Sequence, residues 1–244
     1  MERTRRVLAQ LLALASPACP GCGVARGSPL CAACAQASGV AASVRVASIG
    51  SLPLLFAGSY HDRGGLGLSP LGRALHAFKD RGDRHAGRML SRLFATLVAP
   101  QALGFDVAVP VPPDLARLRQ RSFSPSAWLT RELARRSGLA WSTTALQRVP
   151  GRPPQRGLDG RRRRENARGA FRVGRGRVRG YAVLLVDDVV TTGATLLDAA
   201  ARLVESGASS VTCAVLACAD EDLAHPCRSR TGNAGTNDTA SRPG

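Results

Sequence analysis

The sequence feature that most constrains the fold is an apolar run followed by two acids and a short loop rich in hydroxyl groups. It reads YAVLLVDDVVTTGATL over residues 181–196. The continuous apolar segment 183–186 is typical of a central parallel strand that is buried on both faces. Asp187 and Asp188 then stand at the carboxyl end of this strand, where open α/β sheets bind ligands. The pattern therefore predicts a strand, an acid pair, a binding loop and a helix that begins near Ala194.

Strand and helix patterns alternate through the rest of the chain. Apolar runs predict strands at residues 51–60, 106–110, 140–144, 181–186 and 210–216. Apolar residues at helical spacing predict helices at residues 71–80, 85–98, 124–137 and 194–206. This alternation predicts an α/β fold in which helices flank a parallel sheet.

The loop after the acid pair has the residue types of a phosphate-binding turn. Gly193 lets the backbone approach an anion closely, and the N-terminus of the following helix attracts negative charge. The loop also offers three hydroxyl donors: Thr191, Thr192 and Thr195. Because two carboxylates repel a bare phosphate, we expect Asp187 and Asp188 to bind ribose hydroxyls or a Mg²⁺ that bridges to them. The alternative is a chance strand-to-helix turn with an acidic cap.

The same stretch resembles the phosphoribosyl-pyrophosphate (PRPP) binding motif of type I phosphoribosyltransferases. The resemblance implies that Asp187 and Asp188 contact the 2′ and 3′ hydroxyls of the ribose and favour the positive charge that develops on the ring during transfer. It implies that the 5′-phosphate is bound by a continuous segment made of Val189, Val190, Thr191, Thr192, Gly193, Ala194 and Thr195. It also implies an α/β fold of the type I phosphoribosyltransferase kind, with Mg²⁺ bound together with PRPP.

Longer parts of the chain are similar to the ComF/GntX-like branch of this superfamily, which is associated with competence and DNA uptake. FDVAVPVPPDLARLRQRSFSPSAWLTRELA, at residues 105–134, resembles its proline-bracketed strand end and arginine-rich segment, and LHAFKDRGD, around Lys79, is also similar. RVPGRPPQRGLDGRRRRENARGAF matches the branch at Arg148, Gln155, Leu158, Arg163, Asn166, Ala170 and Phe171. The resemblance implies a pyrophosphate loop and hood that include Val109, Pro110, Val111, Pro112, Arg121, Gln155, Arg163 and Asn166.

The chain departs from these patterns at two places. The branch carries Arg-Gly-Phe-Asn-Gln where this chain has Arg, Ser, Phe, Ser and Pro at residues 121–125, so the contacts of that loop differ. Enzymes that salvage 6-oxopurine bases carry an Asp that serves as a base where this chain has Thr191. The resemblance therefore argues against that substrate group, and no motif indicates the acceptor.

Four cysteines near the N-terminus have the spacing of metal ligands, in the order Cys19, Cys22, Cys31 and Cys34. Two close pairs of thiolates suit tetrahedral Zn²⁺, and a closed set of four leaves no coordination position for catalysis. The ComF-like proteins also carry a cysteine-rich N-terminal finger, which the resemblance extends to this chain. Two disulfides are the alternative in an exported protein. We expect a structural zinc site.

These features divide the chain into three parts. We expect an N-terminal helix with a four-cysteine, zinc-finger-like module at residues 1–40 and a phosphoribosyltransferase-like domain at residues 41–224. Within that domain, the polar and glycine-rich segment 148–171 is expected to be a flexible hood loop. The tail at 225–244 lacks periodicity and is expected to be disordered.

The chain carries a formal charge of +17 and a sequence pI near 11.4, which favours nucleic acid, phosphates or acidic surfaces as partners. Lys79 is the only lysine, so this charge is almost wholly arginine and reflects in part a coding bias. The unbroken arginine run 161–164 has three interpretations. It is a solvated loop, a hood that surrounds departing pyrophosphate with charge, or a contact for nucleic-acid phosphates. Aromatic residues are only 4% of the chain, which gives little support to base stacking.

The function that these patterns indicate is a ComF-like phosphoribosyltransferase-domain protein that binds PRPP with Mg²⁺ and transfers phosphoribosyl to an unidentified base or amine. The alternative is a non-catalytic accessory protein of competence and DNA uptake, which binds single-stranded DNA or a competence or helicase protein. Both hypotheses use the same nucleotide pocket. A homodimer is compatible with either hypothesis.

The localisation expected from the sequence is cytoplasmic. An odd number of cysteines, unevenly spread, does not resemble a secreted disulfide framework. No apolar stretch is long enough to span a membrane. The basic and then apolar start of the chain is short, so we interpret it as a docking helix rather than a signal peptide.

Overall fold

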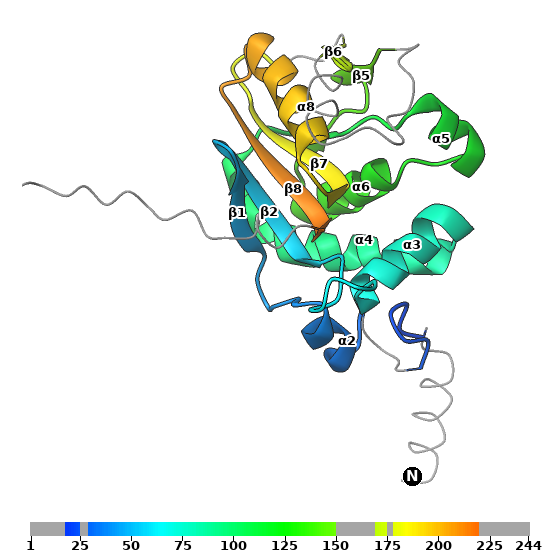
Figure 1. Cartoon of the computed structure of the whole chain (residues 1–244). Helices are drawn as coiled ribbons and strands as arrows, with labels where there is room; N and C mark the ends of the chain where they lie inside the picture. The colour runs from blue at the N-terminus through cyan, green and yellow to red at the C-terminus, as the bar shows by residue number, and fades with distance from the viewer. Residues whose placement is uncertain (1–17, 25–28, 150–168, 175–177, 220–244) are drawn as a thin grey trace, which may run out of the picture.

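A six-stranded sheet forms the centre of the computed structural model, which describes residues 18–24, 29–149, 169–174 and 178–219 (Figure 1). The strand order is β1-β2-β8-β7-β3-β4. Its strands are β1 (Arg45–Ile49), β2 (Leu52–Ser59), β3 (Val107–Pro110), β4 (Ala140–Trp141), β7 (Ala182–Val190) and β8 (Ser210–Cys218). Every pairing is parallel except that of β1 with β2. The predicted α/β fold is confirmed, with an antiparallel edge strand that the sequence did not indicate.

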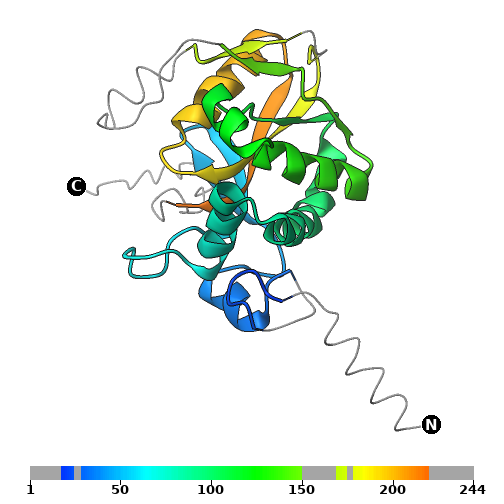
Figure 2. The same cartoon turned by 90° about the vertical axis from the view of Figure 1, so that its right-hand side faces the viewer.

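Helices cover both faces of the sheet (Figure 2). The helices α3 (Pro70–Arg81), α4 (Arg84–Val98) and α6 (Pro125–Ser137) lie on one face, and α8 (Ala194–Glu205) lies on the other. In β7, Leu184 and Val186 pack toward the first group, whereas Val183 and Leu185 pack toward α8. The central strand is therefore apolar without interruption because both of its faces are buried.

The shorter elements lie at the ends of this layered core. They are α2 (Ala32–Ala37), the 3₁₀ helix η1 (Ala99–Gly104), α5 (Leu115–Arg121), and an antiparallel hairpin of β5 (Leu146–Arg148) and β6 (Phe171–Val173). None of the described helices is long and apolar enough to cross a membrane.

The helix ends follow from local capping residues. The Ser69 hydroxyl accepts a hydrogen bond from the N–H of Gly72 and begins α3, which ends at Gly82 in the left-handed region. Asp83 caps α4, and its carboxylate accepts hydrogen bonds from two N–H groups of the first turn. These caps place the observed helices within two residues of the bounds that the periodicity predicts.

The structure corrects two expectations about loops. β7 continues to Val190 because its pairing with β8 extends to Cys218, so the acid pair lies inside the strand rather than after it. The two ends of the segment 148–171, expected to be loop, are strands: Arg148 pairs with Phe171. Residues 150–168, the expected N-terminal helix and the expected tail lie outside the described residues.

The cysteine-rich segment packs against the start of α3. Cys19, Leu30 and Cys34 are buried in the apolar cluster that contains Leu71 and Leu75 of α3. The Leu71 N–H donates to the hydroxyl of Ser38 at 2.9 Å. The Arg73 guanidinium donates to the carbonyl of Gly21 at 3.4 Å. α3 therefore begins on the cysteine-rich segment.

Ser122 gives a prediction about stability. Among the described residues it is the only non-glycine with a positive φ, 60°, and it stands where the ComF-like pattern has glycine. We expect Ser122→Gly to raise the free energy of unfolding by about 0.5–1 kcal/mol, because glycine adopts this conformation without a steric cost. Urea unfolding measures the change. Ser206→Gly, at a position where φ is −88°, is the control and should lower stability.

Candidate functional site

Two acids lie near the carboxyl end of β7, between the parallel neighbours β3 and β8. Asp188 is 8% exposed, and Asp187 is partly exposed. Because side chains alternate along a strand, Asp188 lies on the face of the sheet that α3 covers and Asp187 on the face of α8 and the hairpin. Neither acid is turned freely into solvent, which is the arrangement expected of groups that bind a ligand.

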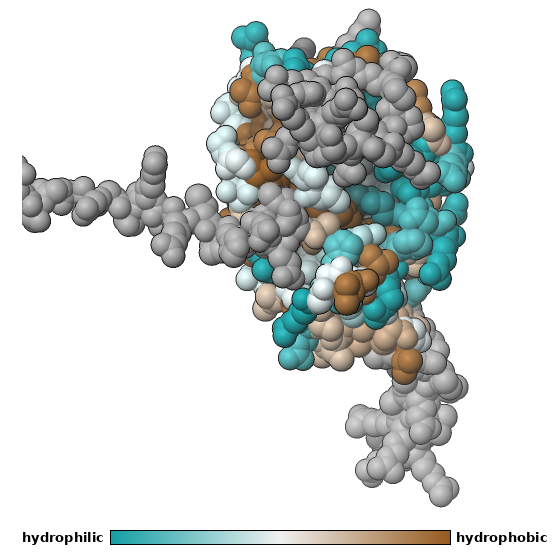
Figure 3. All heavy atoms as spheres, viewed as in Figure 1, coloured by the Kyte–Doolittle hydropathy of each residue, from teal (hydrophilic) through white to brown (hydrophobic). Residues whose placement is uncertain are grey.

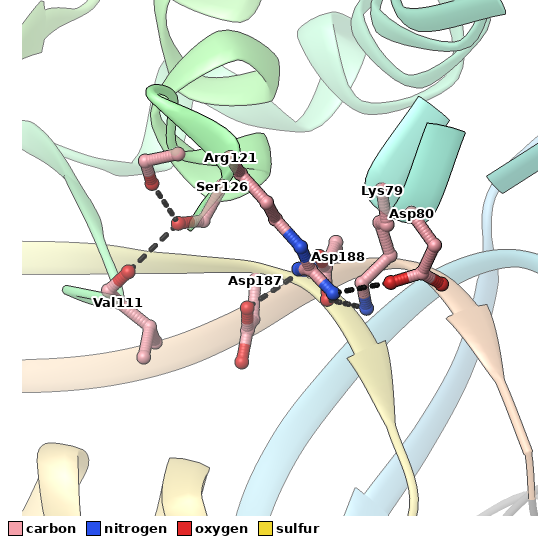
Figure 4. A network of polar contacts seen from close by, with 8 residues as sticks. Lys79, Asp80, Val111, Arg121, Ser126, Asp187 and Asp188 are labelled. Atoms are coloured by element: carbon pink, nitrogen blue, oxygen red, sulfur yellow. Dashed lines mark hydrogen bonds and ion pairs between the residues drawn. The ribbon is translucent and has the colours of Figure 1, made fainter. Parts of the chain in front are cut away.

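Asp188 is held by a charge network that comes from α3 and α5 (Figure 4). The Lys79 ammonium donates to its Oδ1 at 2.9 Å. The neighbouring residue, Asp80, accepts a hydrogen bond from Arg121 of α5 at 2.6 Å. Figure 3 shows hydrophilic side chains gathered on the side of the molecule that carries α3 and α5. One cation thus contacts Asp188 directly, and a second is paired with the next residue of α3.

Burial raises the pKa of Asp187 to about 7, and the negative charge of Asp188 contributes in the same direction. Three groups oppose this change: the N–H of Asp188, which donates to Asp187 Oδ1 at 2.8 Å, and the charges of Lys79 and Arg148. A carboxyl group with a strongly raised pKa is typical of a functional site.

The raised pKa predicts how stability depends on pH. Between the ordinary value of 3.8 and about 7, the folded state holds a proton on Asp187 that the unfolded state releases. Stability should therefore fall as the pH rises through this interval, and the loss should be complete above it. Asp187→Asn should reduce this fall, which urea unfolding of both proteins from pH 4 to pH 8 measures. Identical pH profiles would contradict the burial of an ionisable group here.

The end of β3, to which the sequence analysis assigned the pyrophosphate loop, lies beside the acid pair. Val109 and Pro110 pair with Leu185 and Val186 of β7, and the Val111 N–H donates to the Val186 carbonyl at 2.8 Å. The Val111 carbonyl in turn accepts a hydrogen bond from the Ser126 hydroxyl at 2.7 Å, which fixes the strand end to α6 (Figure 4).

Arg148 approaches the same place from the hairpin. Its Nε donates to the carbonyl of Pro112 at 3.5 Å, and its guanidinium lies 4.8 Å from the ring centre of Phe171. Burial lowers the pKa of Arg148, whereas Asp187 is among the acids that raise it. Of the residues predicted for the loop and hood, the structure thus brings Val109, Pro110, Val111, Pro112 and Arg121 to the site. Gln155, Arg163 and Asn166 lie outside the described residues.

The segment predicted to bind phosphate divides into a strand end and a turn. Val189 and Val190 belong to β7, and Val190 is buried. The turn is formed by Thr191, Thr192 and Gly193, and it leads into Ala194 and Thr195, the first residues of α8. No side chain caps this helix, so its first N–H groups face the turn without a side-chain acceptor. Such a helix N-terminus favours an anion.

Gly193 has the backbone conformation that this turn requires. Its φ is 74°, in the left-handed region, and a Cβ atom there would collide with the side chain of Ile49. Glycine is therefore needed for conformation and for space.

Asp198 is a site residue that the sequence analysis missed. This buried carboxylate of α8 accepts hydrogen bonds from the N–H groups of Gly169 and Ala170, at 2.8 and 2.9 Å. It fixes the start of β6 to the helix that follows the phosphate turn. A lone acid on the apolar face of a predicted helix is the pattern that would have singled it out.

The four N-terminal cysteines form a compact cluster. Their Sγ atoms all lie within 4.8 Å of one another. The Sγ atoms of Cys22 and Cys31 are 3.9 Å apart, almost twice the ~2.05 Å of a disulfide. Tetrahedral coordination with Zn–S distances of about 2.3 Å places sulfurs about 3.8 Å apart. The donor set and its spacing therefore fit a tetrahedral metal ion.

Comparison with known proteins matches a family model, the phosphoribosyl transferase domain, to residues 136–232. The DNA utilization protein YhgH of Salmonella typhi is 34% identical over 147 residues, which are 58% of this chain and 64% of that protein. Competence protein F of Haemophilus influenzae is 29% identical over 151 residues, 59% of this chain and 66% of that protein. The chain thus matches less than two thirds of the length of the YhgH relatives.

Among solved structures, the chain is similar to a glutamine PRPP amidotransferase from B. subtilis, with a TM-score of 0.38 and 21% identity. That match covers 52% of this chain and 26% of the other.

The mostly parallel sheet and the acid pair agree with the family model, so the chain contains a region similar to the phosphoribosyl transferase domain. Among curated proteins, the chain is similar to YhgH and to competence protein F. The chain is therefore similar to ComF-like proteins.

Proposed function

We propose that the site binds PRPP together with Mg²⁺. The observation that carries this proposal is the acid pair of β7, followed directly by a glycine turn and a helix N-terminus without a side-chain cap. The carboxylates of Asp187 and Asp188 accept hydrogen bonds from the ribose hydroxyls. The N–H groups of the turn, with the hydroxyls of Thr191, Thr192 and Thr195, bind the 5′-phosphate.

We further propose that the bound PRPP is a substrate for phosphoribosyl transfer. A nitrogen of the acceptor forms a bond to C1′ while the bond from C1′ to the pyrophosphate oxygen breaks, and pyrophosphate leaves with the bonding electrons. The ring gains positive charge in the transition state, which the two acids stabilise. Arg121, and Mg²⁺ when it is bound, stabilise the leaving pyrophosphate. The acceptor is a base or an amine.

Calorimetry with PRPP and Mg²⁺ tests this function. We expect the wild type to bind PRPP. In Asp187→Ala/Asp188→Ala the affinity for PRPP should fall about 100-fold or more, because several hydrogen bonds to charged groups are removed. The control is Glu132→Ala/Glu205→Ala, which removes two surface acids that pair with arginines. Wild-type protein that fails to bind PRPP would overturn the proposal. Binding without turnover on a broad panel of bases and amines would retain the pocket and reject the transfer.

A second candidate function, binding of single-stranded DNA, is favoured by the surface of α4 and α6. On α4, which carries no acid, an exposed arginine recurs every four residues, at Arg84, Arg88 and Arg92. The adjacent α6 exposes three more arginines: Arg131, Arg135 and Arg136. Glu132 lies among them, and its pKa is lowered by Arg135, with further contributions from Arg92 and Arg136. The relatives' names, DNA utilization protein and competence protein F, agree with this candidate.

Fluorescence anisotropy with a labelled single-stranded oligonucleotide tests the second function. The variant Arg88→Gln/Arg92→Gln/Arg135→Gln should bind the oligonucleotide more weakly. The slope of log K against log salt concentration should become less steep by about 0.7 for each phosphate that is no longer neutralised. The control removes three exposed arginines outside the two helices: Arg63→Gln/Arg172→Gln/Arg179→Gln. Equal weakening in both variants would show an effect of net charge alone and would reject the surface.

We also propose that the metal of the cysteine cluster is zinc and that its role is structural. The support is a donor set of four sulfurs at tetrahedral spacing, with no position left for a reacting water. Cys19 and Cys34 are buried against α3, so the metal stabilises the packing of this segment on the main sheet domain.

A further inference from the structure

Lys79 is the only lysine of the chain, and it lies at the acid pair rather than on the open surface. Its side chain is 17% exposed and comes from the last turn of α3. Its ammonium is 2.9 Å from Oδ1 of Asp188. The other basic residue in this network, Arg121, donates a hydrogen bond to Asp80, the next residue of α3. α3 therefore supplies one cation to the site and positions a second.

The ammonium of Lys79 donates a hydrogen bond to Oδ1 of Asp188. The proposed function requires a ribose hydroxyl to donate to the same carboxylate. Ligand hydroxyls and the ammonium therefore compete for Asp188. A cation displaced from a largely buried carboxylate needs another anion nearby, because an uncompensated buried charge is costly.

The chemistry of the ribose supplies that anion. The carbon that carries the 2′ hydroxyl is bonded to C1′, and in PRPP C1′ carries the pyrophosphate. A hydroxyl bound to Asp188 therefore brings the pyrophosphate close to the ammonium. The lysine stem has four flexible carbons and can follow the ligand, whereas a planar arginine fork is more restricted.

We propose that Lys79 is a substrate-binding residue. When PRPP binds, its ammonium leaves Asp188 and forms an ion pair with the pyrophosphate group. The proposal rests on the proposed function of the site and assigns it a preference for ribose 5-phosphates that carry an anionic group at C1′. Asp80 has a related positioning role, since it holds Arg121 beside the same group.

The test compares two ligands that differ only in the pyrophosphate. Calorimetry with PRPP and Mg²⁺, and separately with ribose 5-phosphate, is carried out on the wild type and on Lys79→Met. We expect Lys79→Met to weaken PRPP binding roughly 10- to 100-fold, the range of a hydrogen bond to a charged group. Ribose 5-phosphate should bind Lys79→Met as well as or better than the wild type, because the competing ammonium is absent.

The outcomes separate the two proposals. Equal weakening of both ligands would mean that Lys79 only holds Asp188 in place, and this inference would be wrong while the proposed function stands. A wild type that binds neither ligand would overturn the proposed function and this inference with it. Arg81→Met, two residues further along and exposed, is the matched control and should leave both affinities unchanged.

A second measurement follows Lys79 in the wild-type protein, so it does not depend on the folding of a variant. Reductive methylation with ¹³C-formaldehyde labels Lys79 and the chain's α-amino group, and the Lys79 signal is the one that is absent from Lys79→Arg. PRPP with Mg²⁺ should shift the Lys79 signal in the wild type, and ribose 5-phosphate should shift it differently. A Lys79 signal that responds identically to both ligands would contradict the transfer to pyrophosphate. Lys79→Arg, which keeps the charge, should retain part of the preference for PRPP.

Discussion

Cys34→Ser is expected to release the metal and to unfold the segment of the chain around the cysteine cluster. Cys19, Leu30 and Cys34 are the only buried hydrophobic residues among the described residues 18–24 and 29–40, so this segment has a small core of its own. Serine replaces the Cys34 thiolate with a neutral hydroxyl, so the variant loses one of the four sulfur ligands that would hold the ion. We expect Cys34→Ser to lower the free energy of unfolding of this segment by several kcal/mol, the contribution that structural zinc makes in small modules.

Metal analysis and hydrogen exchange measure this result. The wild type should hold about one equivalent of zinc, and Cys34→Ser should hold far less. Exchange protection should fall in α2 and at the start of α3. Cys213→Ala, which changes a buried cysteine of β8 outside the cluster, is the control and should keep the zinc. Wild-type protein with an intact fold and well under one equivalent of metal would refute the zinc site.

Gly193→Ala is expected to lower the free energy of unfolding by about 2–4 kcal/mol, the sum of a left-handed conformation and an overpacked contact. The new Cβ would collide with Ile49, a buried residue at the end of β1. The turn that we assign to the 5′-phosphate would have to move, so PRPP affinity should fall as well. Urea unfolding and calorimetry measure the two effects.

Two other glycines separate the causes. Gly138 has a φ of 75°, and an added Cβ atom would meet nothing within 4 Å, so Gly138→Ala tests the conformational cost alone, about 1 kcal/mol. Gly104 has open space and no positive φ, so Gly104→Ala should be neutral or slightly stabilising. If Gly193→Ala costs no more than Gly138→Ala, the contact with Ile49 relaxes freely and the turn is not constrained by packing.

The strand that carries the site was predictable because its residues are dictated by burial on both faces. The run 183–186 has no polar residue, and the structure packs it between two helical layers. The caps at Ser69, Gly82 and Asp83 are equally local, which explains why the bounds of α3 and α4 agree with their patterns.

The features that escaped prediction depend on contacts between residues far apart in the sequence. β1 is an edge strand whose register is set by β2, and the hairpin joins residues on either side of a long segment without apolar periodicity. The pairing of Lys79 with Asp188 spans 109 positions, and the bonds from Asp198 to the start of β6 span 28 and 29. Sequence identified the acids of the site but not the groups that hold them.

α3 has one further consequence, because its first turn lies on the cysteine cluster and its last turn supplies Lys79. If ligand binding at the acid pair and metal binding at the cysteines each stabilise α3, the two proposed sites are linked, and linkage is reciprocal: the ligand then tightens the metal by the same factor as the metal tightens the ligand. Affinities for nucleotides measured on partly demetallated protein would therefore describe a mixture of two species.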